Sequence, residues 1–555
     1  MKRSLPTASF IVIFFLIPIR LNGQPGSYTH YLDHPWVDSV LSTLSMEEKL
    51  AQSHWVLCSP DDGLPELMEI ARSVREHSLG GLIYTAAPDE RMRELAAWCL
   101  SAGALAPVIA LEGPWDGMYP GMLSLGAITS DSLRYLAGRK LAAQYRNAHV
   151  SLLISRNVDE AVASGLQDGW VQVMDPGQAS GLNAFISRIP ASRIREVKEG
   201  MEEPIQADRI DLHARQVLAL KYWIRLQEAD TAESVQKGIP DDKAAQSAFL
   251  RELYAQSMTV LNNREQLIPI RELESTRIAC LAINQEQETE FQAMAARYTR
   301  THNHFWNPGG EKLDELVGEL AGYDLVLAAL YPGPYKEETQ EFLASLNQQS
   351  KLALVWFGDP ASLGTSTGIT DGGSTAGPEG LILAYEQNPF TERLSAQLLF
   401  GGIGGNGRLP VAMAEKYPAG SGIHTPGGLR LQYGFPENAG LCSAKLNRTI
   451  DSIVHRGLEA GAYPGCQVIV ARKGTVVFHK AYGHHSYEDR IEVREHDLYD
   501  LASVTKISGP LSGLMFLEGM GKFSYQGRLG DYCDAMKGSD KAGLALKDVL
   551  AHRAG

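Results

Sequence analysis

The sequence predicts a multidomain α/β protein: a shortened (β/α) barrel, then an α/β sandwich with a mostly parallel sheet, then a partial α+β domain. Three observations support this prediction. The chain has 555 residues, 44% of them hydrophobic and 21% charged, so it is globular and too long for a single core. Apolar strand-like runs alternate with helical segments along most of its length. A β-hairpin pattern begins at residue 466.

The first residues have the composition of a secretory signal peptide. Lys2 and Arg3 precede an apolar run from Phe10 to Ile19. This run is about half of the ~20 apolar residues that a membrane-spanning helix needs. We therefore predict a cleaved signal peptide over residues 1–23, export of the protein, and no stable membrane span after cleavage.

Helices and strands alternate through the first predicted domain, residues 36–230. Ser45 and Glu48 have the spacing of a capping box, which marks the start of a helix. The pattern beyond them predicts helices at 64–76, 90–102 and 130–146 and strands at 81–84 and 107–111. Because the domain is shorter than the ~250 residues of an eight-fold βα barrel, we expect a barrel from which pieces are missing.

The second predicted domain, residues 245–441, follows a polar linker. Its pattern predicts strands at 258–261, 277–283, 323–330 and 351–357, which alternate with helices near Glu288, Glu311, Glu337 and Thr391. This alternation predicts an α/β sandwich with a mostly parallel sheet. A region rich in glycine and proline, residues 401–440, closes the domain without regular periodicity.

The third predicted domain covers residues 443–555. It opens with an amphipathic helix at 446–459, and a hairpin follows, with strands at 466–471 and 475–480. The sequence then stops in a turn before any further strand could complete the sheet. We therefore expect the N-terminal half of a truncated domain.

Composition argues against several classes of partner. The net charge is −14 and no basic stripe interrupts it, so we expect no nucleic-acid partner. The six cysteines lie far apart and form no metal-binding spacing, which predicts small buried thiols, no metal and no cofactor. The oligomeric state stays open.

The strongest catalytic candidates are Ser503 and Lys506. A helix that begins at Ser503 places both side chains on one face, where the lysine can take or orient the serine proton. A helix N-terminus also offers unpaired N–H groups to an acyl oxyanion. The same spacing occurs at Ser234 and Lys237, but that pair lies among charged residues, whereas Ser503 follows an extended apolar segment. We therefore predict that Ser503 is the nucleophile of an acyl transfer and that Ser234 is not.

Four segments of the third domain resemble the first half of the class C β-lactamase and penicillin-binding-protein-like serine hydrolases. They are residues 464–468, 498–506, 530–532 and 550–555. The resemblance implies that Ser503 is the nucleophile and Lys506 its base partner. The Tyr-x-Asn and Lys/His-x-Gly segments of that family do not occur before the sequence stops. An interior proline, Pro510, is expected to weaken the helix that should hold the pair.

The two upstream domains resemble the barrel and sandwich of glycoside hydrolase family 3. The matching segments are 46–52, 124–128, 192–195 and 216–221 in the barrel and 257–263, 397–402, 407–411 and 431–436 in the sandwich. With the third domain, the combination is similar to exported β-N-acetylhexosaminidase–β-lactamase fusions. It implies a periplasmic or cell-surface hydrolase of O-glycosyl compounds that acts on a glycan or a cell-wall-derived substrate.

The barrel lacks the catalytic residues that this resemblance would imply. The family's Asp-Gly-Glu-Trp-Gly segment corresponds to residues 112–116, where both acidic contacts are altered, and its histidine loop and nucleophile strand are not identifiable. A retaining glycosidase needs two carboxylates about 5 Å apart. Glu112, directly after an apolar strand, is the one acidic position that we retain as a substrate-binding candidate.

Whether the chain is an enzyme therefore stays open. The favoured hypothesis is an exported hydrolase with a degenerate glycosidase site and an acyl-transfer serine site. The alternative is a non-catalytic glycan-binding or scaffold barrel that carries a truncated, inactive serine hydrolase. A third possibility is a fragment or an internally deleted variant.

Overall fold

The computed structural model divides the chain into two compact units, Met1–Thr449 with Val470–Phe478, and Ile450–Ile469 with His479–Gly555. The structure describes residues 28–86, 89–102, 105–112, 121–148, 150–154, 158, 160–168, 171–174, 187–190, 207–229, 243–309, 313–333, 337–367, 377–413, 416–488 and 490–554. The expected signal peptide and the Ser234–Lys237 pair lie outside these residues. Within them, no helix is long and apolar enough to cross a membrane.

The first sheet has six parallel strands in the order β5-β4-β3-β2-β1-β6. Their bounds are His54–Cys58 (β1), Gly81–Tyr84 (β2), Val108–Glu112 (β3), Leu152–Ile154 (β4), Gln172–Met174 (β5) and Ser187–Pro190 (β6). Among the described strands, β5 and β6 are the two ends of the sheet, and no pairing between them is seen. The parallel α/β class of this domain is confirmed.

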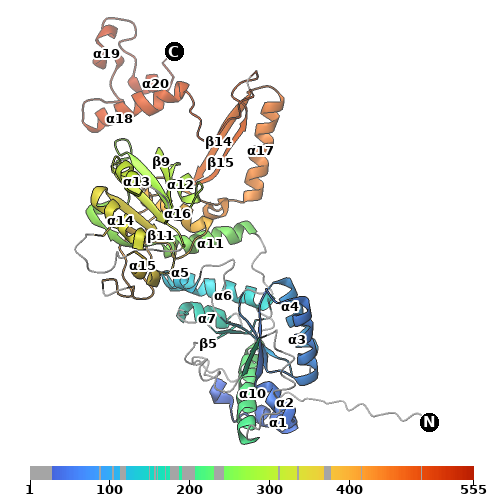
Figure 1. Ribbon diagram of the computed structural model, residues 1–555. Coiled ribbons are helices and arrows are strands. Elements are labelled where there is room, and N and C mark those ends of the chain that lie inside the picture. Colours follow the sequence, from blue (N-terminus) through green and yellow to red (C-terminus); the bar gives the residue numbers. More distant parts are fainter. Residues whose placement is uncertain are drawn as a thin grey trace. The chain divides into compact units, whose positions relative to one another are not determined.

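Helices cover both faces of this sheet (Figure 1). They are α1 (Pro35–Thr43), α2 (Met46–Gln52), α3 (Leu64–His77), α4 (Glu90–Ala102), α5 (Met122–Gly126), α6 (Asp131–Asn147), α7 (Glu160–Asp168) and α10 (Ala207–Ala229). Apolar side chains of α3, α4, α6 and α7 form one core with the sheet, and those of α1 and α10 form another. The predicted capping box starts α2, because Glu48 N donates to Ser45 Oγ and Ser45 N donates to the Glu48 carboxylate.

A close contact between Trp55 and Gly81 holds β1 against β2. The fully buried ring of Trp55 lies against Gly81, where a Cβ atom would stand 2.6 Å from the indole carbon Cε3 and 2.8 Å from Val108 O. No larger residue fits at position 81 without moving a strand. The glycine therefore allows the β2 backbone to approach the largest side chain of this core.

The second sheet has the order β7-β12-β11-β10-β8-β9, with only β7 antiparallel to its neighbour among these six strands. Their bounds are Thr259–Asn263 (β7), Ile278–Ile283 (β8), Thr301–Trp306 (β9), Leu325–Leu330 (β10), Leu352–Trp356 (β11) and Gly380–Leu383 (β12). The predicted sandwich with a mostly parallel sheet is thus confirmed.

Alternate residues of each central strand face opposite cores, as the period of two requires. In β8, Cys280 belongs to the core beneath α11, α12 and α16, whereas Leu281 belongs to the core beneath α13, α14 and α15. These helices span Lys243–Ser257 (α11), Glu290–Ala295 (α12), Leu313–Leu320 (α13), Glu337–Gln349 (α14), Pro360–Thr367 (α15) and Pro389–Leu399 (α16). Both faces of the sheet are therefore buried, which explains the unbroken apolar runs of β8 and β10.

The predicted hairpin forms from β14 (Gly465–Arg472) and β15 (Thr475–Gly483), after helix α17 (Ser443–Glu459). Its turn residues Lys473 and Gly474 have φ angles of 52° and 76°, as a tight two-residue hairpin turn requires. A short strand, β13 (Gln432–Tyr433), pairs in parallel with β15 at Thr475 and Val476.

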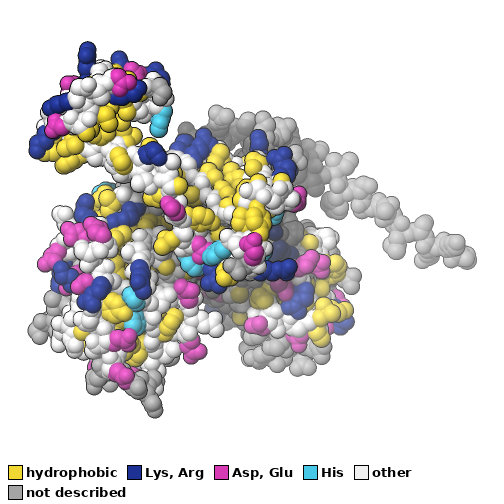
Figure 2. Space-filling model, turned by 90° about the horizontal axis from the view of Figure 1, so that it is seen from above, with side chains coloured by type: hydrophobic (Ala, Val, Ile, Leu, Met, Phe, Trp, Pro, Cys, Tyr) yellow, Lys and Arg dark blue, Asp and Glu magenta, His cyan; other side chains and the backbone are white. Residues whose placement is uncertain are grey.

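The second unit continues through short helical elements that are α18 (Ser512–Gly519), α19 (Leu529–Tyr532) and α20 (Leu546–Leu550). Large apolar side chains lie exposed here, among them Met515 at 65% and Phe516 at 70%. Figure 2 shows hydrophobic side chains at the surface of this part of the chain. The described part of this unit therefore encloses little core of its own.

Candidate active site

The structure brings Ser503 and Lys506 together. Ser503 lies in a 3-10 turn, Ala502–Val504, and Lys506 directly precedes the next helical turn. Lys506 Nζ donates a hydrogen bond of 3.1 Å to Ser503 Oγ. Both side chains are exposed. The predicted spacing thus gives a direct contact between a hydroxyl and an amine, open to a substrate.

The backbone before the serine is held in an uncommon conformation. Ala502 has a φ angle of 42°, in the left-handed region that residues with a Cβ seldom adopt. Its N–H donates 2.8 Å to Asp500 Oδ1, and Val504 N donates 2.9 Å to Leu501 O. These two bonds close a tight turn around the serine. Strained backbone of this kind is found preferentially at functional sites.

Pro510 affects the helix after the serine in a way that the sequence did not specify. Ile507–Leu511 forms a π-helical turn that contains Pro510, and α18 begins only at Ser512. A proline has no N–H for an α-helical bond, and its ring collides with the carbonyl four residues earlier. The wider π turn accommodates this ring, and Ser512 Oγ donates 3.0 Å to Ile507 O. The helix is therefore interrupted beyond the pair, while the Ser503–Lys506 contact is kept.

A hydrogen-bonded anchor ties the segment before the serine to β14. Gln467 Nε2 donates to Arg494 O at 2.7 Å and to Asp497 O at 2.9 Å. The Asp497 carboxylate accepts from Arg494 N at 2.7 Å and contacts His485 Nε2 at 2.6 Å. The bond from Arg494 N and then the bond with His485 lower the pKa of Asp497. This anchor lies only six residues before Ser503.

His485 is exposed, and its contact with Asp497 was not identified from the sequence. The signal that could have found this contact is weak, because twelve residues of irregular backbone separate the two side chains.

Glu112, the predicted substrate-binding residue, is the last residue of β3. It is half-buried and lies opposite Ile154 of β4, at the carboxyl edge of the parallel sheet. Ligands of parallel α/β sheets bind at this edge. Residues 113–120, which complete the segment that resembles the family's sugar-binding motif, lie outside the described residues.

A carboxylate that sequence reasoning missed, Glu386, holds the chain just after this loop. Glu386 Oε1 accepts from Gly121 N at 2.6 Å and from the Ser124 hydroxyl, and Oε2 accepts from the Tyr254 hydroxyl at 2.9 Å. Burial and then the Glu386 charge raise the pKa of Tyr254. Three donors satisfy this carboxylate, so Glu386 positions the end of the loop that follows Glu112.

No metal-binding group of three or more histidine, cysteine or acidic side chains occurs among the residues that the structure describes. The buried thiols predicted from composition are found at Cys58, Cys99 and Cys280. Cys442 is exposed, and Cys466 and Cys533 are partly exposed, so the prediction of buried thiols is wrong for these three. They lie in and around the third domain, where little core is enclosed.

The geometry around Ser503 agrees with a family comparison. Residues 450–555 match the family model described as Beta-lactamase. The expected family of the third domain is thereby confirmed, and Ser503 and Lys506 both lie inside the β-lactamase segment. Their catalytic roles stay a prediction.

Solved structures that resemble the chain come from enzymes that act on glycosides. A glycoside hydrolase family 3 β-N-acetylglucosaminidase from Paenibacillus sp. str. FPU-7 is 12% identical, over 67% of this chain and 99% of that chain, with a TM-score of 0.48. A β-glucosidase from Erythrobacter marinus is 10% identical, over 70% and 82%, with a TM-score of 0.46. A β-glucosidase from Listeria innocua in complex with isofagomine is 11% identical, over 69% and 76%, with a TM-score of 0.43.

The first of these belongs to the family that the upstream motifs resemble. With TM-scores below 0.5, these likenesses carry no argument about activity, and the α/β folds of the first two domains rest on their own strand pairings. A search of the curated proteins gave no match.

Proposed function

We propose that this chain is an exported hydrolase whose β-lactamase segment performs acyl transfer at Ser503, attached to domains of glycoside hydrolase family 3 ancestry. The observation that carries the proposal is the 3.1 Å contact between Lys506 Nζ and Ser503 Oγ inside the matched segment. The sequence motifs support a periplasmic or cell-surface location and a substrate derived from cell-wall or related glycan material.

The chemistry follows from the two groups. Lys506 in its uncharged form accepts the proton of the Ser503 hydroxyl while Oγ attacks an ester or amide carbonyl. The bond from the carbonyl carbon to the leaving oxygen or nitrogen breaks, and Lys506 returns the proton to that atom. Water then attacks the acyl-serine ester, which releases a carboxylic acid and restores the hydroxyl. The turn at Ala502–Val504 holds Oγ in place for both steps.

Labelling with a fluorophosphonate probe tests this proposal on the full chain. We expect the probe to be recovered on the peptide that contains Ser503, and Ser503→Ala to abolish labelling. Ser234→Ala is the matched control, because Ser234 has the same spacing to a lysine, and it should label like the wild type. Labelling that persists in Ser503→Ala would contradict the assignment.

We propose in addition that the first domain, whose glycosidase site is degenerate, binds N-acetylhexosaminides at the carboxyl edge of its sheet. The motif resemblance and the place of Glu112 at the end of β3 support this role. Calorimetric titration with N-acetylglucosamine is the assay, and Glu112→Gln should weaken binding at least tenfold. Absence of binding by the wild type would reject this role without bearing on Ser503.

A further inference from the structure

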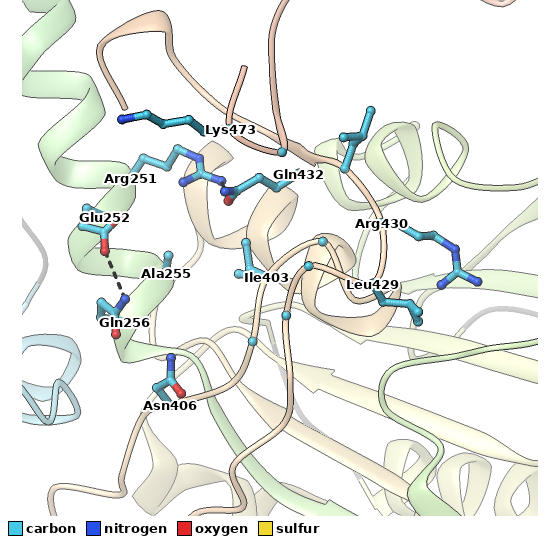
Figure 3. A pocket seen from close by; sticks show the side chains of 16 residues that line it. Arg251, Glu252, Ala255, Gln256, Ile403, Asn406, Leu429, Arg430, Gln432 and Lys473 are labelled. Carbon is cyan, nitrogen blue, oxygen red and sulfur yellow. Dashed lines mark hydrogen bonds between the residues drawn. The ribbon is translucent and has the colours of Figure 1, made fainter. Parts of the chain in front are cut away.

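A cavity of about 730 Å³ lies in the first unit, on the sandwich domain. Helix α11, the glycine-rich stretches 402–404 and 427–432, and the hairpin turn at Lys473 and Gly474 supply its lining. Figure 3 shows these walls facing one another across the cavity. The volume lies in the range of pockets that hold small ligands, about 300–1,000 Å³. This place is distinct from Glu112 and from Ser503.

Arg251 is the central charged group of this cavity. Its side chain is only 5% exposed, yet it lines the cavity. Nε donates 3.1 Å to Tyr433 O, and Nη2 donates 2.8 Å to Gln432 Oε1. Among the described residues, no acceptor pairs with Nη1. A buried guanidinium with an unused donor is costly unless an anion or water meets it.

The other two cations of the lining, Arg430 and Lys473, differ in whether they can bind a ligand. Arg430 donates to three backbone carbonyls, those of Ile270, Phe400 and Arg271, so its guanidinium is committed to the fold. Figure 3 shows its side chain directed away from Arg251. Lys473 is exposed at the hairpin turn, and it makes no ion pair with any described residue. Its flexible ammonium can therefore reach a ligand at the rim.

The lining contains a single acidic side chain, Glu252. Gln256 Nε2 donates 3.0 Å to Glu252 Oε1, so this carboxylate is partly engaged. Arg251, Arg430 and Lys473 thus outnumber it, and the local charge favours an anionic ligand. The side-chain amides of Gln256, Gln432 and Asn406 add neutral groups that suit hydroxyls.

Glycines leave one wall of the cavity without projecting side chains. A Cβ atom at Gly404 would stand 3.0 Å from Gly427 N, so the two stretches pack backbone against backbone. Gly428, next to them, has a φ angle of 77° and open space beside it. The wall therefore presents peptide groups instead of side chains, as surfaces that bind polar ligands closely do.

We propose that this cavity binds a sugar that carries a carboxylate, with Arg251 and Lys473 facing the carboxylate and the amides facing the hydroxyls. Arg430 is committed to backbone carbonyls, so Arg251 and Lys473 are the two cations that can face a ligand. Two cations match the two oxygens of a carboxylate better than the three oxygens of a phosphate ester. The volume leaves room for a saccharide larger than one ring. The site would dock an acidic glycan on the sandwich, independently of Ser503 and Glu112.

Calorimetric titration of the full chain tests this with three matched probes. D-glucuronate should bind, D-glucose should not bind measurably, and glucose 6-phosphate should bind more weakly than glucuronate. Equal binding of glucose would overturn the proposal, because the carboxylate would then contribute nothing. Tighter binding of the phosphate ester, or no binding of glucuronate, would also overturn it.

Two variants and one control assign the site. Lys473→Gln removes an exposed charge and should weaken glucuronate binding about tenfold, the usual effect of losing a charge-assisted hydrogen bond. Lys445→Gln removes another exposed lysine of the same unit and should leave binding unchanged. Arg251→Lys should abolish binding, with folding checked by circular dichroism. Wild-type affinity in Lys473→Gln and in folded Arg251→Lys would reject the site, and neither result depends on Ser503 or Glu112.

Discussion

The hydroxyl of Tyr254 donates a 2.9 Å hydrogen bond to Glu386, although 132 residues separate them in the sequence. Glu386 in turn accepts from Gly121 N. One carboxylate thus joins α11, the segment after β12 and the start of α5. We expect the link to stabilise the first unit, because a bond to a charged acceptor contributes about 1.5–3 kcal/mol.

Tyr254→Phe should therefore lower the free energy of unfolding of the first unit by about 1–3 kcal/mol. Burial raises the pKa of Tyr254, so in the wild type the unfolded chain ionises above pH 10.0 while the folded tyrosine stays protonated. This contribution is present below pH 10.0 and is lost as the pH rises, and the variant should lack that loss. Urea denaturation between pH 8 and 11 measures both effects.

Tyr417→Phe is the control for that experiment. Tyr417 is 8% exposed, and no described residue accepts a hydrogen bond from its hydroxyl. Its removal should change the free energy of unfolding little. Equal losses in both variants would show that the Glu386 contact contributes nothing specific.

We expect acyl transfer to require Lys506 as a proton acceptor, and not only for its positive charge. Lys506→Met should slow fluorophosphonate labelling of Ser503 at least about 100-fold, the lower end of general-base contributions. Lys506→Arg should not restore it, because a guanidinium does not lose its proton. Lys522→Met, at an exposed lysine after α18, is the control. Fast labelling of Lys506→Arg would argue for a purely electrostatic role.

The anchor at Asp497 should control the order of the segment before Ser503. Asp497→Asn removes the charge that His485 contacts, so trypsin should cleave faster after Arg494 and labelling of Ser503 should slow. The folded pKa of Asp497 is lowered, so the wild-type anchor is intact above pH 3.8 and is lost only as the pH falls below that value.

His485→Gln should share part of this effect, whereas His484→Gln should resemble the wild type. His484 is the adjacent histidine, and its side chain contacts no partner among the described residues. Cleavage and labelling that are the same in all four proteins would mean that the anchor does not hold this segment.

Gly81→Ala should destabilise the first sheet by about 1–3 kcal/mol, because the new methyl group meets the ring of Trp55 at 2.6 Å. Gly318→Ala is the matched control in α13, where a Cβ atom meets nothing within 4 Å. There alanine should stabilise by about 0.5–1 kcal/mol through helix propensity. Thermal unfolding of both variants gives the comparison, and equal shifts would contradict the packing argument.

The sequence predicted the elements whose signals are local. The apolar run of β10 and the capping box at Ser45 reflect burial and backbone bonding within a few residues. Strand β9 was missed because it lies at the edge of its sheet, where Asn303 and other exposed polar side chains replace the apolar run. Strand β12 was also missed, although it is as short and as buried as β2, which was predicted.

The same distinction applies to the sites. Ser503 and Lys506 were predictable because one helical turn joins them. Glu386 and Arg251 were not, because their partners lie 132 and 181 residues away and only the folded chain brings them together. The sequence indicated a shortened barrel but not the order of its strands, since a length argument carries no information on strand pairing.

The exposure of the segment around Ser503 affects how often this segment opens locally. None of the residues 498–522 is buried, so a local opening there breaks few apolar contacts and costs little free energy. Its amide hydrogens should exchange with solvent while the rest of the protein stays folded. Those of β8 and β10 should exchange only through global unfolding. On slow heating, acyl transfer at Ser503 should therefore be lost at a lower temperature than glycan binding by the sandwich.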